Sequence, residues 1–82
     1  MVLKHRLRMK LMILGTQVQE ARVSAGLTQT AAAERIGMTR GNYARIEYGK
    51  SNVTIETLVR VAEGLGLEVT VTLAARAKRP GS

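Results

Sequence analysis

Apolar and small residues recur along the middle of the chain with the period of helices that bury one face. Residues 16–25, 29–36, 40–48 and 55–65 each repeat such residues at spacings of three and four, with polar residues between them. Helices of this length become stable mainly by packing their apolar faces together. The pattern therefore predicts a small bundle of short helices.

Threonine and glycine residues mark the ends of these predicted helices. A threonine hydroxyl accepts a hydrogen bond from a backbone N–H that the first turn leaves unpaired, and glycine adopts the left-handed conformation that ends a helix. The predicted beginnings have Thr16, Thr28, Thr39 and Thr54, and the predicted ends have Gly26, Gly37, Gly49 and the pair Gly64 and Gly66. Thr16 and Gln19 have the spacing of a capping box, so the first helix is predicted to begin at Thr16.

Residues 27–50 contain the pair of helices around which the rest is interpreted. Two helices of about two turns, 29–36 and 40–48, flank a turn at Gly37. Two short helices joined by a tight turn containing glycine form a helix-turn-helix, whose second helix enters the DNA major groove. An ordinary helical hairpin in a bundle has the same spacing, so this stretch alone leaves both interpretations open.

The segment after the last predicted helix has a different period. In residues 67–73, apolar residues alternate with Glu68, Thr70 and Thr72, which is typical of a strand; the apolar residues are Leu67, Val69, Val71 and Leu73. A single strand after four helices leaves its backbone groups unpaired. We therefore expect it to pair with the same strand of a second subunit across a two-fold axis, and the alternating segment 1–13 is the alternative partner.

The two ends of the chain are basic. Residues 1–13 alternate basic and apolar positions, which favours a basic arm or an edge strand, although the leucines at 3, 7, 11 and 14 also fit a helical stripe. Met9 and Met12 are alternative first residues. Residues 74–82 are predicted to form a basic flexible tail.

Charge is distributed unevenly along the 82 residues, whose formal net charge is +7. Four basic residues lie in 1–13 and three in 76–82, whereas residues 14–75 hold six basic residues and six glutamates. Three of these six basic residues lie within 40–50, against one glutamate. A local positive patch on a neutral body favours contact with phosphates.

Composition excludes several classes of function. The sequence has no Cys and no Asp, and His5 is its single histidine. Catalytic triads, paired aspartates and histidine metal sites therefore lack parts, and we expect no enzymatic activity, cofactor or metal. No apolar run approaches the roughly 20 residues of a membrane-spanning helix, so no membrane partner is expected. The absence of cysteine suits a reducing cytoplasm.

Four short motifs carry a family resemblance. Arg22 is followed after four residues by Leu-Thr-Gln, and then come Ala-Glu-Arg-Ile-Gly-Met-Thr, Ala-Arg-Ile-Glu-Tyr-Gly-Lys and Thr-Ile-Glu-Thr-Leu. With these motifs, residues 14–65 resemble the Xre/Cro/cI-type helix-turn-helix regulators. The resemblance implies a mainly α, lambda-repressor-like bundle of four to five helices within residues 14–66. The segment Gly-Leu-Glu-Val-Thr-Val-Thr-Leu is similar to that of HipB-type antitoxins, whose dimers are joined by a C-terminal strand.

The resemblance also implies roles for individual residues. Base-edge contacts are usually made at the positions of Arg40, Gly41, Ala44 and Arg45. Backbone phosphates are usually held at the positions of Gln29, Thr39, Lys50, Ser51 and Asn52. Arg22 and Glu47 match an ion pair between the first helix and the end of the third. Tyr43 replaces the usual Ile or Val, and we expect its ring to fill the volume that the small Ala32 leaves.

These features together predict a regulator of transcription. We expect a homodimer that binds double-stranded DNA at a palindromic operator and represses by occupying it. Arg40 and Arg45 would read guanine, because an arginine fork matches guanine O6 and N7. Two alternatives remain: an antitoxin that binds a cognate toxin and represses their shared operon, and a protein-interaction scaffold without specific DNA affinity.

Overall fold

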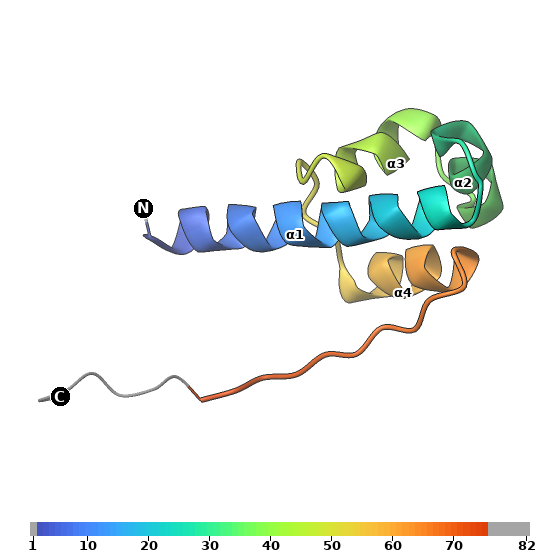
Figure 1. Ribbon diagram of the computed structural model, residues 1–82. Helices are drawn as coiled ribbons and strands as arrows, with labels where there is room; N and C mark the ends of the chain where they lie inside the picture. The colour runs from blue at the N-terminus through green and yellow to red at the C-terminus, as the bar shows by residue number, and fades with distance from the viewer. Residues whose placement is uncertain (1, 76–82) are drawn as a thin grey trace, which may run out of the picture.

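The computed structural model describes residues 2–75, which form four helices: α1 (Val2–Ser24), α2 (Gln29–Ile36), α3 (Arg40–Glu47) and α4 (Ile55–Gly64). The three short helices surround the second half of α1, whereas the first half of α1 extends beyond them (Figure 1). The mainly α bundle with a helix-turn-helix that the sequence predicts is confirmed.

Threonine caps begin the three short helices, as predicted. The Oγ1 atoms of Thr28, Thr39 and Thr54 accept hydrogen bonds from backbone N–H groups three residues further on, at distances of 3.0, 3.1 and 3.1 Å. Gly37 ends α2 with a φ of 80°, in the left-handed region that side chains disfavour. These local signals set the bounds of α2, α3 and α4 to within a residue or two of the prediction.

The first helix begins much earlier than the sequence predicts. α1 spans 23 residues from Val2, so the arm or edge strand predicted for residues 1–13 is wrong for the described residues 2–13. Thr16 lies inside the helix, and its Oγ1 donates to the carbonyl of Met12 at 3.0 Å instead of capping a first turn. The leucines at 3, 7, 11 and 14 do follow a helical stripe. The alternation of basic and apolar residues in this segment does not correspond to a strand, because residues 2–13 are helical.

Two close backbone contacts hold α1 against the end of α3. A Cβ atom on Gly15 would overlap the backbone of Glu47 and lie 2.5 Å from the carbonyl oxygen of Ile46. Met12, one turn before Gly15 in α1, makes the second contact: a Cβ on Gly49 would lie 2.9 Å from the Cα of Met12. Gly49 also has a φ of 70°, which favours glycine on its own account. These contacts fix the direction in which the first half of α1 leaves the bundle.

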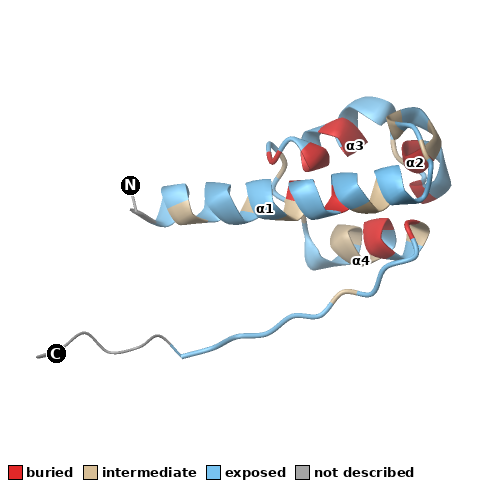
Figure 2. Ribbon diagram, viewed as in Figure 1, coloured by how far each residue is buried: buried red, intermediate tan, exposed pale blue. Residues whose placement is uncertain are grey.

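One apolar cluster forms the core between the helices (Figure 2). Its buried members are Val18, Ala32, Ala33, Ile36, Tyr43, Ile46, Val61 and Leu65. Tyr43 and Ala32 both lie in it with no exposed surface, which is the arrangement expected of a large ring beside a small residue. The core thus joins the helix-turn-helix to α1 and α4.

The chain after α4 forms no regular structure within the described residues. Residues 67–75 have neither helix nor strand, and they run alone in the direction of the N-terminal half of α1 (Figure 1). The strand predicted for residues 67–73 is therefore absent from the single chain. A strand needs a hydrogen-bonding neighbour, and residues 2–13, the alternative partner, are helical. The predicted basic tail falls largely on residues 76–82, which lie outside the described residues.

Candidate nucleic-acid interface

The outward face of α3 is basic and convex. Arg40 and Arg45 are exposed, and Gly41, Arg45 and Tyr48 follow one another on one face at helical spacing. The one acidic residue of α3, Glu47, is only 6% exposed. The helix therefore presents positive charge without exposed negative charge. A helix of this kind fits the width of the DNA major groove.

The predicted base-contacting residues do not all lie on this face. Arg40, Gly41 and Arg45 are exposed, but Ala44 is only 6% exposed. Ala44 therefore offers little surface for the base contact predicted for it. The reason is that α3 packs between α1 and α2, so that its inward side takes up half of its positions. The methyl group of Ala44 lies on that side.

The exposed Arg45 side chain also makes a hydrogen bond within the protein. Its guanidinium Nη2 donates to the backbone carbonyl of Lys50 at 3.0 Å, while the backbone N–H of Lys50 donates to the carbonyl of Arg45 at 2.9 Å. These two bonds hold the start of the α3–α4 loop against α3. A guanidinium has five N–H donors, so Arg45 keeps others for a ligand.

The residues predicted to hold phosphates lie at both ends of α3. Thr39 caps its first turn, and the loop after it contains the exposed Lys50 and Asn52 and the half-buried Ser51. The side chain of Gln29, which is also predicted to hold a phosphate, donates from Nε2 to the Glu47 carboxylate at 3.1 Å. Gln29 thus has a structural partner, with one amide hydrogen remaining.

An ion pair connects α1 with the end of α3. Arg22 Nε lies 2.6 Å from Glu47 Oε2 and Arg22 Nη2 lies 3.2 Å from Glu47 Oε1, while Arg22 Nη1 donates to the carbonyl of Leu27 at 2.9 Å. The Glu47 side chain is 1% exposed and that of Arg22 is 13% exposed. The pair implied by the family resemblance is therefore present, and it is structural: it satisfies both charges inside the protein.

Burial and hydrogen bonding in this cluster shift the pKa values of Glu47 and Tyr43. Burial alone would raise the pKa of Glu47, but the hydrogen bonds from Arg22 and Gln29 outweigh it and lower that pKa below its ordinary value. Burial raises the pKa of Tyr43, and the neighbouring Glu47 carboxylate adds to this effect. The Tyr43 hydroxyl has no hydrogen-bond partner among the described residues. It stays neutral and serves the core rather than a ligand.

Two exposed residues at α3, Asn42 and Tyr48, were not among the residues predicted to contact DNA. Asn42 is exposed in the first turn of α3, and Tyr48 is 58% exposed at its end. Asn42 precedes Arg45 by three residues, a spacing that places both side chains on neighbouring positions of a helix. That spacing was the available signal. An asparagine amide can pair with adenine in the major groove.

Gly41→Ala is expected to raise the free energy of unfolding by about 1 kcal/mol, because alanine favours helix over glycine. A Cβ on Gly41 would meet no atom within 4 Å, and Gly41 is not among the glycines with positive φ. Thermal denaturation would show a melting temperature higher by about 4–8 °C. A lower melting temperature would mean that the folded chain itself requires glycine here.

Comparison with known proteins agrees with this geometry. A family model described as Helix-turn-helix (HTH_3) matches residues 18–71, which include the whole of α2, α3 and α4. The chain belongs to this Xre-type helix-turn-helix family. Proteins of the HTH_3 family are DNA-binding regulators of transcription and are generally not enzymes. The first 16 residues of α1, up to Gln17, precede the region that the family model matches.

Two curated relatives share the HTH_3 region. The chain is 38% identical over 53 residues to an uncharacterized HTH-type transcriptional regulator of Methanothermobacter thermautotrophicus, covering 65% of the chain and 77% of that protein. It is 30% identical over 61 residues to the SPbeta prophage-derived uncharacterized HTH-type transcriptional regulator YonR of Bacillus subtilis, covering 74% of the chain. The matched region spans little more than half of the length of YonR, 56%.

Residues 2–75 hold neither a candidate metal site nor a helix that could span a membrane. No group of three or more histidine, cysteine or acidic side chains there could hold a metal ion. None of the four helices combines the length and the apolar character that crossing a membrane requires.

Proposed function

We propose that this protein is a sequence-specific regulator of transcription that binds double-stranded DNA as a homodimer at a palindromic operator, in the cytoplasm, and represses by occupying it. The observation that carries the proposal is the exposed face of α3, which presents Arg40 and Arg45 while its one acid is buried. Membership of the HTH_3 family supports the same conclusion.

Base reading and phosphate holding would fall to different parts of this surface. Arg40 and Arg45 would contact base edges in the major groove, together with the amide of Asn42. Thr39 at the start of α3 and Lys50, Ser51 and Asn52 in the loop after it would contact the sugar–phosphate backbone, which sets the position and orientation of α3 on the duplex.

The segment after α4 supports a dimer. Among the described residues, the apolar side chains near its end are largely uncovered: Val71 is 63% exposed and Leu73 is 95% exposed. We propose that Leu67, Val69, Val71 and Leu73 pair with the same residues of a second copy in a two-stranded ribbon. A two-fold axis of this kind would place two α3 helices about 34 Å apart, which matches half-sites one turn of DNA apart.

The exposed apolar residues of this segment also suit the antitoxin alternative, in which they would bind a toxin instead of a second copy. Co-purification with the product of the adjacent gene would favour that alternative. A homodimer that purifies alone and binds its operator would favour the regulator.

The base-reading role is tested by replacing Arg40 and Arg45 with Ala, singly, and measuring binding to a duplex selected from random sequences. Each substitution is expected to weaken binding to the selected duplex by about 5- to 150-fold, because a bidentate arginine–guanine pair discriminates by about 1–3 kcal/mol. Binding to random duplex should change little.

Arg35→Ala is the matched control, since Arg35 is exposed at the end of α2 and donates to the carbonyl of Gly64 in α4. Its removal should leave both affinities unchanged. An equal loss on selected and random duplex would show that Arg40 or Arg45 contacts only phosphates.

A further inference from the structure

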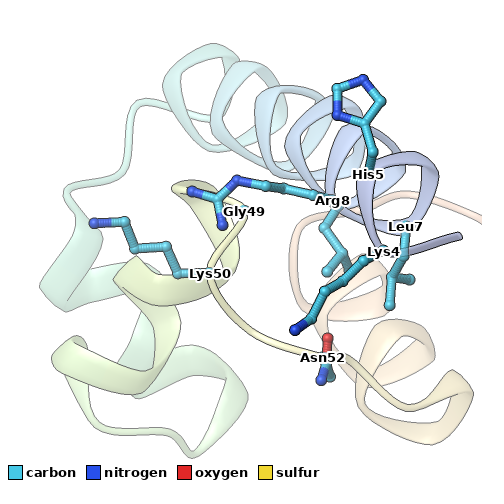
Figure 3. Close-up of a pocket in the computed structure, with 8 residues that line it drawn as sticks. Lys4, His5, Leu7, Arg8, Gly49, Lys50 and Asn52 are labelled. Atoms are coloured by element: carbon cyan, nitrogen blue, oxygen red, sulfur yellow. The ribbon is translucent and has the colours of Figure 1, made fainter. Parts of the chain in front are cut away.

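The extended half of α1 forms one wall of a basic cleft. The cleft has a volume of about 390 Å³ and lies between the first three turns of α1 and the loop at Gly49–Asn52 (Figure 3). Lys4 and Arg8 project from α1 toward this loop, whereas Lys50 points away from them and His5 points out of the cleft (Figure 3). Two leucines of α1 complete its floor.

The position of this wall is built into the fold. The cleft begins where α1 leaves its contacts with α3, and those contacts depend on Gly15 and on the turn at Gly49, which lies against Met12. Because α1 continues as a helix back to Val2, the helix fixes the backbone positions of Lys4 and Arg8 relative to the loop. The cleft is therefore a fixed feature, shaped by two glycines at the helix crossing.

The charges around the cleft are unfavourable within the described chain. Lys4 and Arg8 are four residues apart on one helical face, where like charges repel. The first turn of α1 has no acidic residue, and cations near a helix N-terminus oppose the helix dipole. No acidic residue lines the cleft. An anion placed between Lys4 and Arg8 would remove both unfavourable terms.

We propose that this cleft binds a backbone phosphate of the DNA duplex, through Lys4 and Arg8 of α1 and the amide of Asn52. Lys4 Nζ and the Arg8 guanidinium would donate charge-assisted hydrogen bonds to the two free phosphate oxygens. The site rests on the proposed function, because it extends the surface that holds DNA from the loop onto α1. Its position supports this: Asn52 lines both this cleft and the neighbouring one below α3, which Arg45 also lines.

A phosphate is favoured over an acidic protein segment by continuity with the α3 surface. The cleft adjoins Lys50 in the loop that follows α3, so a duplex bound to α3 passes the loop and then meets α1. Residues 2–17 precede the region that the family model matches. Lys4 and Arg8 therefore lie outside the matched region, whereas Asn52 lies within it.

The test is a pair of double variants with equal loss of charge. Lys4→Gln/Arg8→Gln removes the two cations of the cleft, and Arg6→Gln/Lys10→Gln removes two cations that do not line it. Residues two apart lie on roughly opposite sides of a helix, so the control charges point away from the cleft. Glutamine forms helix about as readily as lysine and arginine, so α1 is preserved. Circular dichroism checks that both variants fold.

Binding of the full chain would be measured across salt concentrations on the selected duplex and on a random duplex. For Lys4→Gln/Arg8→Gln, we expect affinity to fall about tenfold on both duplexes, and the slope of log affinity on log salt to weaken by about 1–2. The control variant should stay close to the parent chain, with a slope change of well under 1.

Three results are decisive. Equal behaviour of the two double variants would overturn the cleft as a phosphate site, while leaving specific binding by α3 intact. Equal affinity of the parent chain for selected and random duplex would overturn the proposed function, but a loss confined to Lys4→Gln/Arg8→Gln would still support the cleft. Unchanged DNA binding together with loss of an acidic protein partner in the same variant would also overturn the phosphate assignment.

Discussion

Glu47→Gln is expected to lower the free energy of unfolding by about 3 kcal/mol or more. The substitution leaves the Arg22 guanidinium, whose side chain is 13% exposed, without its counter-charge inside the protein. Removing one partner of a buried ion pair typically costs about 3–5 kcal/mol, because the other charge stays desolvated. A domain of this size has a total stability of about 4–12 kcal/mol, so the variant would lose at least about a quarter of it.

Urea denaturation measures this loss, and Glu34→Gln is the matched control because Glu34 is exposed on α2. The control should change stability by less than about 0.5 kcal/mol. A loss of similar size in both variants would show that the Arg22–Glu47 pair contributes no more than a surface charge.

The same pair makes stability depend on pH in a defined direction. The folded pKa of Glu47 is lowered, chiefly by Arg22 acting against burial, so the unfolded chain takes up this proton first as the pH falls. The stabilisation is complete above the ordinary glutamate pKa of about 4.3 and is lost as the pH falls through the lower folded value. Glu47→Gln should lack this component, and an identical acid slope in parent and variant would contradict it.

Gly15→Ala is expected to destabilise the fold by about 3 kcal/mol, although alanine normally strengthens a helix. The added Cβ would lie 2.5 Å from the carbonyl oxygen of Ile46 and against the backbone of Glu47, so α1 would have to move away from α3. Overpacking usually costs about 1–3 kcal/mol, and contact with backbone rather than a flexible side chain places this case at the upper end.

Thermal denaturation would show a melting temperature lower by more than about 10 °C. Gly41→Ala supplies the comparison, since it makes the same chemical change in a helix where nothing lies within 4 Å of the new atom. The two variants should shift the melting temperature in opposite directions. A rise for both would mean that α1 and α3 tolerate a wider crossing than the structure has.

Local signals made most of the fold predictable. The caps at Thr28, Thr39 and Thr54 act through hydrogen bonds within three residues, so their positions could be read directly from the sequence. The start of α1 could not, because residues 1–13 satisfy a period of two and a helical stripe at once. The conformation of residues 67–73 could not be predicted either, since the pairing of a strand with another chain is not decided by its own residues.

The candidate site was predictable where exposure follows from helical position, as for Arg40 and Arg45. The burial of Ala44 was not foreseen, because the packing of α3 against both α1 and α2 buries more of its circumference than a single contact would. Lys4 and Arg8 could not be placed at all, because their positions depend on α1 being continuous. Tertiary contacts, rather than local propensity, decide these residues.

In the proposed complex with DNA, the bond between the Arg45 side chain and the Lys50 carbonyl would couple the base contact of Arg45 to the phosphate contacts of the loop. A guanidinium that tilts toward a matching base alters its hold on the loop, and a loop drawn toward the backbone of the duplex alters the tilt of the guanidinium. Correct and incorrect sequences would then differ in how firmly the loop sits, as well as in the bases themselves. Discrimination is in this way shared between one side chain and the segment that follows it.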